Sequence, residues 1–418
     1  MYGSREDIRQ NLKMFFIDGI TFMPSMALIS ITAVIPYFLD QLGASTFHIA
    51  LASSMTLICV FLTQPLFGYI ASHSSVMHKT FGKILLLQRF SFLVFIFLIP
   101  VFAGHNAALI NLFLAFWCVF NLFIGSYTVF HTPLLIRLLP PDKRGTIRGI
   151  GFAIGSLLGV GMSALIPVIL GRITYPYNYM TIFALGVFFL FINASVFFRM
   201  RQVKDSEPNE PMSITQYIKR MPSSIGESPP FRTMILTCIF IAVANSILPY
   251  YTLYAIRVFS ATENHIATLA GLAIFAGAIA HIVLGFIVDK FGPRIVAVIV
   301  ACLIAAAGIL ALTTNSLFLL FVSWLLANIG NNGTMIAVSL LLGEVSPTAK
   351  LPLYVGVYFT ISMAVSAVIV LTLAPLLETF GFTTLFAIVL TCGLSSLLIN
   401  IFVLKKRLAK TGSHNGSM

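Results

Sequence analysis

The sequence predicts an all-α membrane protein with twelve transmembrane helices in two pseudosymmetric six-helix bundles. Three observations predict this fold. First, 58% of the 418 residues are hydrophobic and only 9% are charged, whereas about 25% of residues in soluble proteins are charged. Second, the apolar residues fall in runs that are long enough to cross about 30 Å of hydrocarbon. Third, one long polar stretch divides these runs six and six, and the two sets share residues at fixed offsets.

The apolar runs define the predicted elements. Each run holds about 20 residues or more, the length that an α-helix needs to span a bilayer. The twelve predicted spans are 12–38, 47–71, 83–103, 107–138, 149–170, 178–199, 233–257, 264–288, 294–313, 316–342, 353–375 and 381–404.

The net charge of +12 follows a topological pattern. Basic proteins often bind nucleic acid, but the positions of the bases explain the charge differently here. With both termini on the cytoplasmic side, every one of the 25 Lys and Arg residues except Arg172 and Arg257 falls on that side, Arg89 included. This distribution matches the positive-inside rule. We therefore expect a multi-pass protein of the cytoplasmic (inner) membrane, with lipid around it and no nucleic-acid partner.

The polar stretch 200–232 is rich in Pro, Ser and charged residues. It is predicted to be a cytoplasmic linker, with a short amphipathic helix near 212–221 on the inner membrane surface. The linker separates an N-terminal bundle, 1–199, from a C-terminal bundle, 233–405, and a cytoplasmic tail covers 406–418.

The two halves repeat each other weakly, as expected for a duplicated bundle. The matches keep chain order and keep each position on the same predicted side of the membrane. An offset of 207 pairs Trp117 with Trp324, Asn121 with Asn328 and Pro140 with Pro347, and an offset of 217 pairs Tyr37 with Tyr254, His48 with His265 and Gly68 with Gly285.

The stretch GFIVDKFGPR fits the loop pattern G-x3-D-(R/K)-x-G-x-(R/K) with Gly285, Asp289, Lys290, Gly292 and Arg294. With twelve spans in two repeated halves, the chain resembles the major facilitator superfamily of secondary transporters over essentially its whole length. The basic stretch LLPPDKRGTIRGIG after the fourth span is also typical of that family. The resemblance identifies no subfamily. It implies alternating access, in which two halves rock around a central site.

The resemblance also implies a cytoplasmic gate. In the family, the acid of this loop contacts the start of a helix from the opposite half, which here is the fifth span at 145–149. A carboxylate is favoured at a helix N-terminus, and Gly285 permits close helix approach. The first half has Ser72 in place of Asp289. A charge cluster that only sets topology is the alternative for this loop.

Other charges lie near the predicted gate. Arg137 ends the fourth span, and its repeat mate is Glu344. These two residues either form part of the gate or, for Glu344, pair locally with Lys290, Arg294 or Lys350. The remaining bases assigned to the gate are Lys143, Arg144 and Arg148.

Asp18 interrupts an apolar run, roughly 10 Å below the inner surface when counted from a helix start near residue 11. A buried acid at that depth costs a few kcal/mol or more unless it is paired or protonated. We therefore predict a proton-coupling role for Asp18. His131 lies at a comparable depth in the fourth span, and both spans line the central cavity in the family, so His131 is a second candidate. A helix–helix pair without coupling is the alternative.

Polar and aromatic side chains inside the spans are candidates for the substrate cavity, because spans 1, 4, 7 and 10 face the central pathway in the family. Asn and Gln also bond across helices, and Tyr also forms interfacial belts, so structural roles stay open. The candidates are Gln64, Asn121, Asn245, Tyr250, Tyr251, Tyr254, His281, Asn328, Asn331 and Asn332.

The sequence has no phosphate-binding loop, metal-ligand cluster or catalytic constellation, so we expect no enzyme, no cofactor and no metal. We predict a monomeric secondary active transporter that moves a small neutral or amphipathic solute by proton-coupled efflux, as an antiporter. The alternative within this architecture is proton-linked or facilitated uptake of a sugar or other metabolite. The alternative of another class is a transporter-like ligand sensor without flux.

Overall fold

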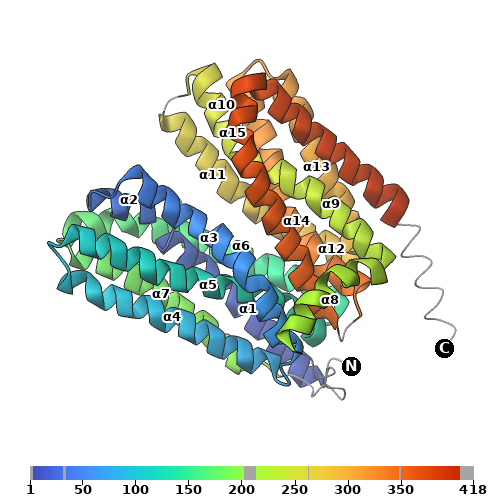
Figure 1. The fold of residues 1–418 in the computed structure, drawn as a ribbon, viewed down its shortest axis with the longest axis horizontal. Coiled ribbons are helices and arrows are strands. Elements are labelled where there is room, and N and C mark those ends of the chain that lie inside the picture. Colours follow the sequence, from blue (N-terminus) through green and yellow to red (C-terminus); the bar gives the residue numbers. More distant parts are fainter. Residues whose placement is uncertain (1–2, 32–33, 202–212, 262, 348–349, 405–418) are drawn as a thin grey trace. The chain divides into compact units, whose positions relative to one another are not determined.

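The computed structural model describes residues 3–31, 34–201, 213–261, 263–347 and 350–404. Within these ranges every regular element is a helix, as Figure 1 shows. The predicted all-α class is therefore confirmed.

The described residues of the first half of the chain form seven helices. They are α1 (Arg5–Leu28), α2 (Val34–Gln41), α3 (Thr46–Ser72), α4 (Met77–Val101), α5 (Asn106–Leu138), α6 (Pro141–Arg172) and α7 (Tyr177–Phe198). A capping box begins α1, because the Ser4 hydroxyl accepts from the Asp7 N–H at 3.1 Å and the Asp7 carboxylate accepts from the Ser4 N–H at 3.0 Å. The hydrogen bonds from Ser4 hold the pKa of Asp7 below its ordinary value.

The second half continues with helices of both α and π type. They are α8 (Ile214–Glu227), α9 (Pro229–Ser246), α10 (Leu248–Phe259), α11 (Glu263–Ile279), the π-helix η1 (Ala280–Leu284), α12 (Gly285–Phe291), α13 (Pro293–Thr313), α14 (Leu317–Val345), α15 (Leu351–Leu398) and the π-helix η3 (Ile399–Leu404). Gly292 separates α12 from α13 with a φ of 85°, a conformation that glycine adopts without strain.

Ten helices of the described chain are long and apolar enough to cross a membrane, judged by length and composition. The first predicted span corresponds to α1 and α2, with residues 32–33 lying outside the described ranges. The last two predicted spans fall in α15 and η3, and Gly381 interrupts α15 with a φ of 74°. Leu351–Ser366, at the start of α15, is a shorter apolar helix.

The chain divides into two compact units. Unit 1 comprises Met1–Pro140 and Ile150–Pro211, and unit 2 comprises Pro141–Gly149 and Met212–Met418. The beginning of α6 therefore packs with unit 2, while the rest of that helix packs with unit 1. The bundle boundaries drawn from the sequence stay a prediction, and the predicted tail, 406–418, lies outside the described residues.

An aromatic cluster fills the core of unit 1. Phe38, Phe92, Phe95, Phe113 and Phe183 are each fully buried. The rings of Phe38 and Phe113 lie 5.7 Å apart in an edge-to-face arrangement, which is favourable for aromatic pairs. This packing ties α2, α4, α5 and α7 together.

One hydrogen bond recurs at equivalent positions of the two units. In unit 1 the Trp117 indole N–H on α5 donates to the Ala52 carbonyl on α3 at 3.0 Å. In unit 2 the Trp324 indole N–H on α14 donates to the Leu269 carbonyl on α11 at 2.8 Å. Ala52 and Leu269 are related by the offset of 217 found in the sequence. The two halves therefore repeat a tertiary contact as well as residues of the sequence.

The linker contains one described helix, α8. It covers Ile214–Glu227, whereas the sequence predicted a helix near 212–221. Ser213 caps it by accepting from the Gln216 N–H at 3.3 Å. One face of α8 is buried through Tyr217, Met221 and Ser224. Its position on a membrane surface stays a prediction.

Candidate functional site

The two predicted proton-coupling residues meet inside unit 1. Asp18 on α1 is fully buried, and its Oδ2 lies 2.9 Å from His131 Nε2 on α5, which is 2% exposed. The carboxylate and the imidazole are joined by a hydrogen bond in a water-poor environment.

Aromatic rings surround this pair. The Tyr127 hydroxyl donates to Asp18 at 3.3 Å, and the Tyr127 ring stacks on His131 with centroids 4.9 Å apart. Phe15 meets the other side of the imidazole edge-on at 5.4 Å, and Phe22 stacks on Tyr127 at 5.2 Å. These rings restrict the imidazole to one orientation toward Asp18.

Close backbone packing places α1 against α6 beside the acid. A Cβ atom on Gly19 would lie 2.7 Å from the Gly151 carbonyl carbon, and one on Gly155 would lie 2.3 Å from the Gly19 oxygen. Both distances are shorter than real Cβ contacts, so only glycine fits. The glycine-rich sequence of α6 thus lets the two helix backbones touch next to Asp18.

Sequence reasoning missed two further members of this site, Asn193 and Arg89. The Asn193 Nδ2 on α7 donates to Asp18 Oδ1 at 2.7 Å. The Arg89 Nη2 on α4 donates to Asn193 Oδ1 at 3.2 Å. The sequence did carry a signal for Arg89, because it interrupts the apolar run LLLQRFSFLVF of a predicted span.

The structure corrects the placement of Arg89. The positive-inside pattern predicts Arg89 at the cytoplasmic side, but it lies midway along α4 and is 2% exposed. Its Nε donates to the Leu190 carbonyl at 3.4 Å, and its Nη1 donates to the Gln88 side-chain oxygen. These bonds and the one to Asn193 compensate for the loss of water around the guanidinium.

The arrangement can bind and release a proton. The Asp18 carboxylate and the His131 imidazole lie within hydrogen-bond distance, so a proton can lie between them. Their charges are also coupled to helix packing, because the four bonded residues Asp18, Arg89, His131 and Asn193 lie on α1, α4, α5 and α7. A change of protonation therefore alters forces between four helices.

A second predicted contact is present in unit 2. The Asp289 carboxylate on α12 accepts from the Gly145 N–H at 2.6 Å and from the Thr146 N–H at 2.5 Å, near the beginning of α6. This is the acid-to-helix-start contact that the family resemblance implies. Favourable partial charge near a helix N-terminus stabilises such a carboxylate.

Glycines make this contact possible. A Cβ atom on Gly145 would lie 2.4 Å from the Gly285 oxygen, and one on Gly149 would lie 2.0 Å from the His281 oxygen. A Cβ on Gly285 would lie 2.8 Å from the Gly145 oxygen. The beginning of α6 therefore touches η1 and α12 backbone to backbone.

The other predicted gate residues make individual contacts. The Arg148 guanidinium donates to the Ser339 hydroxyl at 2.8 Å, and the Arg294 Nε donates to the Asn400 carbonyl at 3.4 Å. Lys290 lies 5.2 Å above the ring of Phe291. Gly292 is the residue that precedes α13. The remaining predicted gate residues are half-buried Arg137 and Arg144 and exposed Lys143 and Glu344.

Lys350, a possible partner of Glu344, instead bonds to Glu227 at the end of α8. Its Nζ lies 2.9 Å from a Glu227 carboxylate oxygen. Both side chains are about half exposed, so this ion pair contributes little to stability.

Three of the predicted cavity asparagines bond to their own helices. Each side-chain amide donates to the carbonyl one turn earlier: Asn121 to Trp117 at 2.7 Å, Asn328 to Trp324 at 2.9 Å and Asn332 to Asn328 at 2.9 Å. The buried Gln64 Nε2 on α3 donates to the Thr128 hydroxyl on α5 at 2.9 Å. These contacts favour the structural alternative for Asn121, Asn328 and Gln64.

Two of the three predicted cavity tyrosines also have structural contacts. Tyr251 is fully buried against Trp324 and Phe386, with ring centroids 5.7 and 4.9 Å away. Tyr254 packs on Phe386 at 5.0 Å. Both belong to the core of unit 2. The other predicted cavity residues are half-buried Asn245, Tyr250 and Asn331 and buried His281, which lies in η1.

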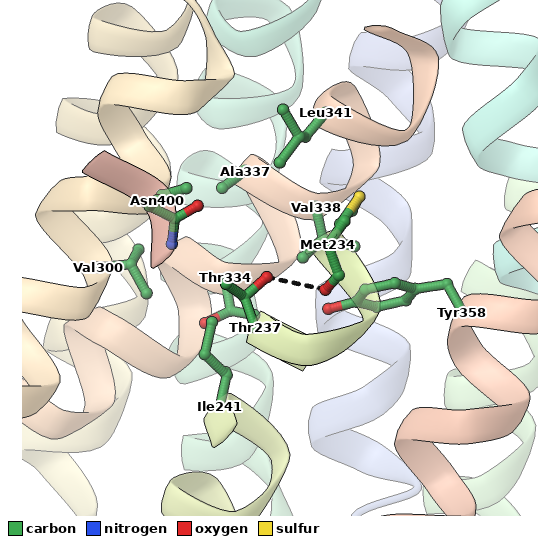
Figure 2. Close-up of a pocket in the computed structure, with 11 residues that line it drawn as sticks. Met234, Thr237, Ile241, Val300, Thr334, Ala337, Val338, Leu341, Tyr358 and Asn400 are labelled. Carbon is green, nitrogen blue, oxygen red and sulfur yellow. Dashed lines mark hydrogen bonds between the residues drawn. The ribbon is translucent and has the colours of Figure 1, made fainter. Parts of the chain in front are cut away.

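A small pocket lies inside unit 2, between α9, α13, α14, α15 and η3 (Figure 2). None of the residues predicted for the substrate cavity lines it. Its lining is mostly apolar, and the buried Asn400 Oδ1 has no hydrogen-bond partner among the described residues. The lining residues are Met234, Thr237, Ile241, Ala297, Val300, Thr334, Ala337, Val338, Leu341, Tyr358 and Asn400.

Comparison with known proteins supports the predicted resemblance. The sequence of residues 233–417 matches the model of the Major Facilitator Superfamily. The second half of the chain is therefore similar in sequence to this superfamily. The predicted resemblance and the predicted transporter fold are therefore confirmed, while the subfamily is not determined.

Solved structures of major facilitator proteins share the fold over nearly the whole chain. The E. coli fucose:proton symporter is 13% identical, with a TM-score of 0.73, and the match covers 95% of this chain and 98% of that one. A bacterial homologue of the iron transporter ferroportin is 14% identical, with a TM-score of 0.70 and coverages of 96% and 100%. The proton:xylose symporter XylE is 14% identical, with a TM-score of 0.67 and coverages of 95% and 96%. No curated protein matches the sequence.

Proposed function

We propose that this protein is a proton-coupled secondary transporter in which Asp18 and His131 form the proton-binding pair. The observation that carries the proposal is the fully buried carboxylate bonded at 2.9 Å to a buried imidazole. An acid at membrane depth is costly, and in transporters such acids serve proton relays. The alternative of a purely structural pair predicts no dependence of transport on a pH gradient.

The contact of Asp289 with the beginning of α6 is the proposed cytoplasmic gate. Two N–H groups of α6 reach one carboxylate at 2.6 and 2.5 Å. When these two hydrogen bonds break during alternating access, the N–H groups and the carboxylate become exposed to water. Their hydration offsets part of the free energy that is lost with the bonds. The contact is therefore suited to form and break within a transport cycle.

The proposed cargo is a small neutral or amphipathic solute. The two deeply buried charged residues of unit 1, Asp18 and Arg89, are bonded to protein groups. A permanently charged cargo would need an opposite charge along its path. The proposed direction is export by proton antiport.

Uptake is the second candidate, and a specific observation favours it. Two of the structures with the same fold are proton symporters of sugars, one of fucose and one of xylose. Since their identity to this chain is only 13% and 14%, they support the fold directly and the cargo only by analogy.

Reconstitution into liposomes tests proton coupling. Protein with an imposed pH gradient is screened against a panel of neutral sugars and amphipathic compounds, with proton movement read from an internal pH-sensitive dye. We expect one compound class to move protons with the wild type and the Asp18→Asn variant to lose this movement to the level of empty liposomes. Asp40→Asn changes an exposed acid on α2 and is the matched control.

The sign of the dye response separates the candidates. Export by antiport and uptake by symport move protons in opposite directions relative to the compound. A compound that binds without any proton or solute movement would instead identify a ligand sensor. Unchanged coupling in folded Asp18→Asn protein would contradict the proposed role of Asp18.

A further inference from the structure

Arg89 is a buried cation without a direct anionic partner. None of the ion pairs in the described part of the chain involves it. Its hydrogen bonds go to a backbone carbonyl and to two side-chain amide oxygens, those of Gln88 and Asn193. An unpaired charge in such a site is very costly, so a compensating charge is expected nearby.

Asn193 supplies the connection to that charge. Its Oδ1 accepts from Arg89 at 3.2 Å, while its Nδ2 donates to Asp18 Oδ1 at 2.7 Å and to the Asp18 backbone carbonyl at 3.2 Å. Because an amide has its donor and acceptor on opposite sides, Asn193 relays the polarity of the guanidinium to the carboxylate. A chain of bonds thus runs from Arg89 through Asn193 and Asp18 to His131.

Resting on the proposed function, we propose that Arg89 is a positioning residue for the Asp18–His131 pair: through Asn193 it orients the carboxylate and supplies the buried positive charge that sets the pair's proton affinity. With Arg89 charged and Asp18 ionised, the network is neutral while His131 is neutral. Adding a proton makes it positive. The positive charge of Arg89 therefore repels the added proton.

The groups that face this network are few. Asp18 is on α1, Arg89 on α4, and Tyr127 and His131 on α5. The contact on α7 is the neutral Asn193, and α6 faces Gly19 with glycine residues. Arg89 is thus the basic group at the opposite end of the bonded chain from His131. Replacing it with a neutral residue removes a positive charge from the network.

Infrared spectroscopy of the purified protein tests the proposal, with protons as the probe. The carboxylic-acid band that Asp18→Asn abolishes is followed as a function of pH. In Arg89→Gln the band should persist to higher pH, because loss of the positive charge tightens proton binding by about tenfold, or about one pH unit. Arg89→Lys should shift less than Arg89→Gln, since it keeps the charge but loses the planar fork.

Two further variants sharpen the test. Asn193→Leu breaks the connection and should shift the band in the same direction as Arg89→Gln. His78→Gln changes another buried polar residue of α4, which bonds to the Phe197 carbonyl, and should leave the band in place. If Arg89→Lys and Asn193→Leu fold and neither they nor Arg89→Gln move the band, Arg89 is only structural and the proposal is overturned.

This readout is separate from transport. A band that depends on Arg89 in a protein whose solute flux ignores the pH gradient would support the role of Arg89 and contradict the proposed function. A solute flux that depends on Asp18, without any shift of the band in the Arg89 variants, would support the proposed function and contradict the role of Arg89.

Discussion

Asp289 and Ser72 occupy equivalent positions of the two halves but make different contacts. The Asp289 carboxylate accepts from two N–H groups of α6. The Ser72 hydroxyl donates to the Gly68 carbonyl of its own helix at 2.8 Å. Asp289 therefore bonds to a different helix, α6, whereas this bond of Ser72 lies within its own helix, α3.

Asp289→Asn is expected to impair transport far more than Ser72→Ala. The amide has one oxygen for two donors, so one N–H of α6 loses its partner, and the favourable charge at the helix start is lost as well. Solute flux in liposomes measures the effect on transport. Labelling of cysteines introduced on the cytoplasmic side measures the effect on closure. Equal effects of the two substitutions would reduce the motif to a topology signal.

The sequence predicts parts of the proposed proton-binding site for a physical reason. Asp18 and His131 stood out because ionisable residues inside apolar runs are expensive. The distance between them depends on packing of α1 against α5, which no local pattern specifies. Arg89 and Asn193 were missed because basic residues near span ends were read as topology signals and a single Asn has many structural roles.

At the scale of helices, the beginning of α6 depends on glycine. A Cβ on Gly149 would lie 2.0 Å from the His281 oxygen, whereas nothing lies within 4 Å of the corresponding position on Gly161, later in the same helix. Both residues are helical, so their intrinsic costs are alike. A difference in stability between alanine variants at Gly149 and Gly161 therefore measures the effect of the close backbone contact at Gly149.

Gly149→Ala should therefore destabilise the protein and Gly161→Ala should not. Overpacking costs about 1–3 kcal/mol, while Gly-to-Ala in a helix gains up to about 1 kcal/mol. Thermal unfolding in detergent compares the two variants. Equal melting temperatures would contradict the helix packing described at Gly149.

The repeated tryptophan bonds yield a paired prediction. Trp117→Phe and Trp324→Phe each keep most of the aromatic packing but remove the bond between neighbouring helices, at 3.0 and 2.8 Å. Each loss should cost about 1 kcal/mol, and the two losses should add, because the bonds lie in different units. A double variant that is no less stable than either single one would contradict their independence.

The whole molecule was predictable to the extent that hydropathy and repetition specify it. Long apolar runs gave the helices, and the offset repeat gave their two sets. The π-helix at His281 and the grouping of Pro141–Gly149 with unit 2 were not predictable, since they arise from contacts between distant segments. The substrate cavity stays a prediction, and for Asn121, Asn328 and Gln64 the hydrogen bonds within the protein favour a structural role.

Membrane topology is the remaining prediction at this scale. Both termini and the linker should lie in the cytoplasm, because nearly all bases then face inside. In a variant without the five native cysteines, a cysteine at Asn106, the exposed first residue of α5, should react with a membrane-impermeant maleimide in intact cells. Cysteines replacing Ser206 or Ser413 should react only after permeabilisation. Labelling of Ser206→Cys in intact cells would invert the topology, and the proposed gate at Asp289 would then face the outside.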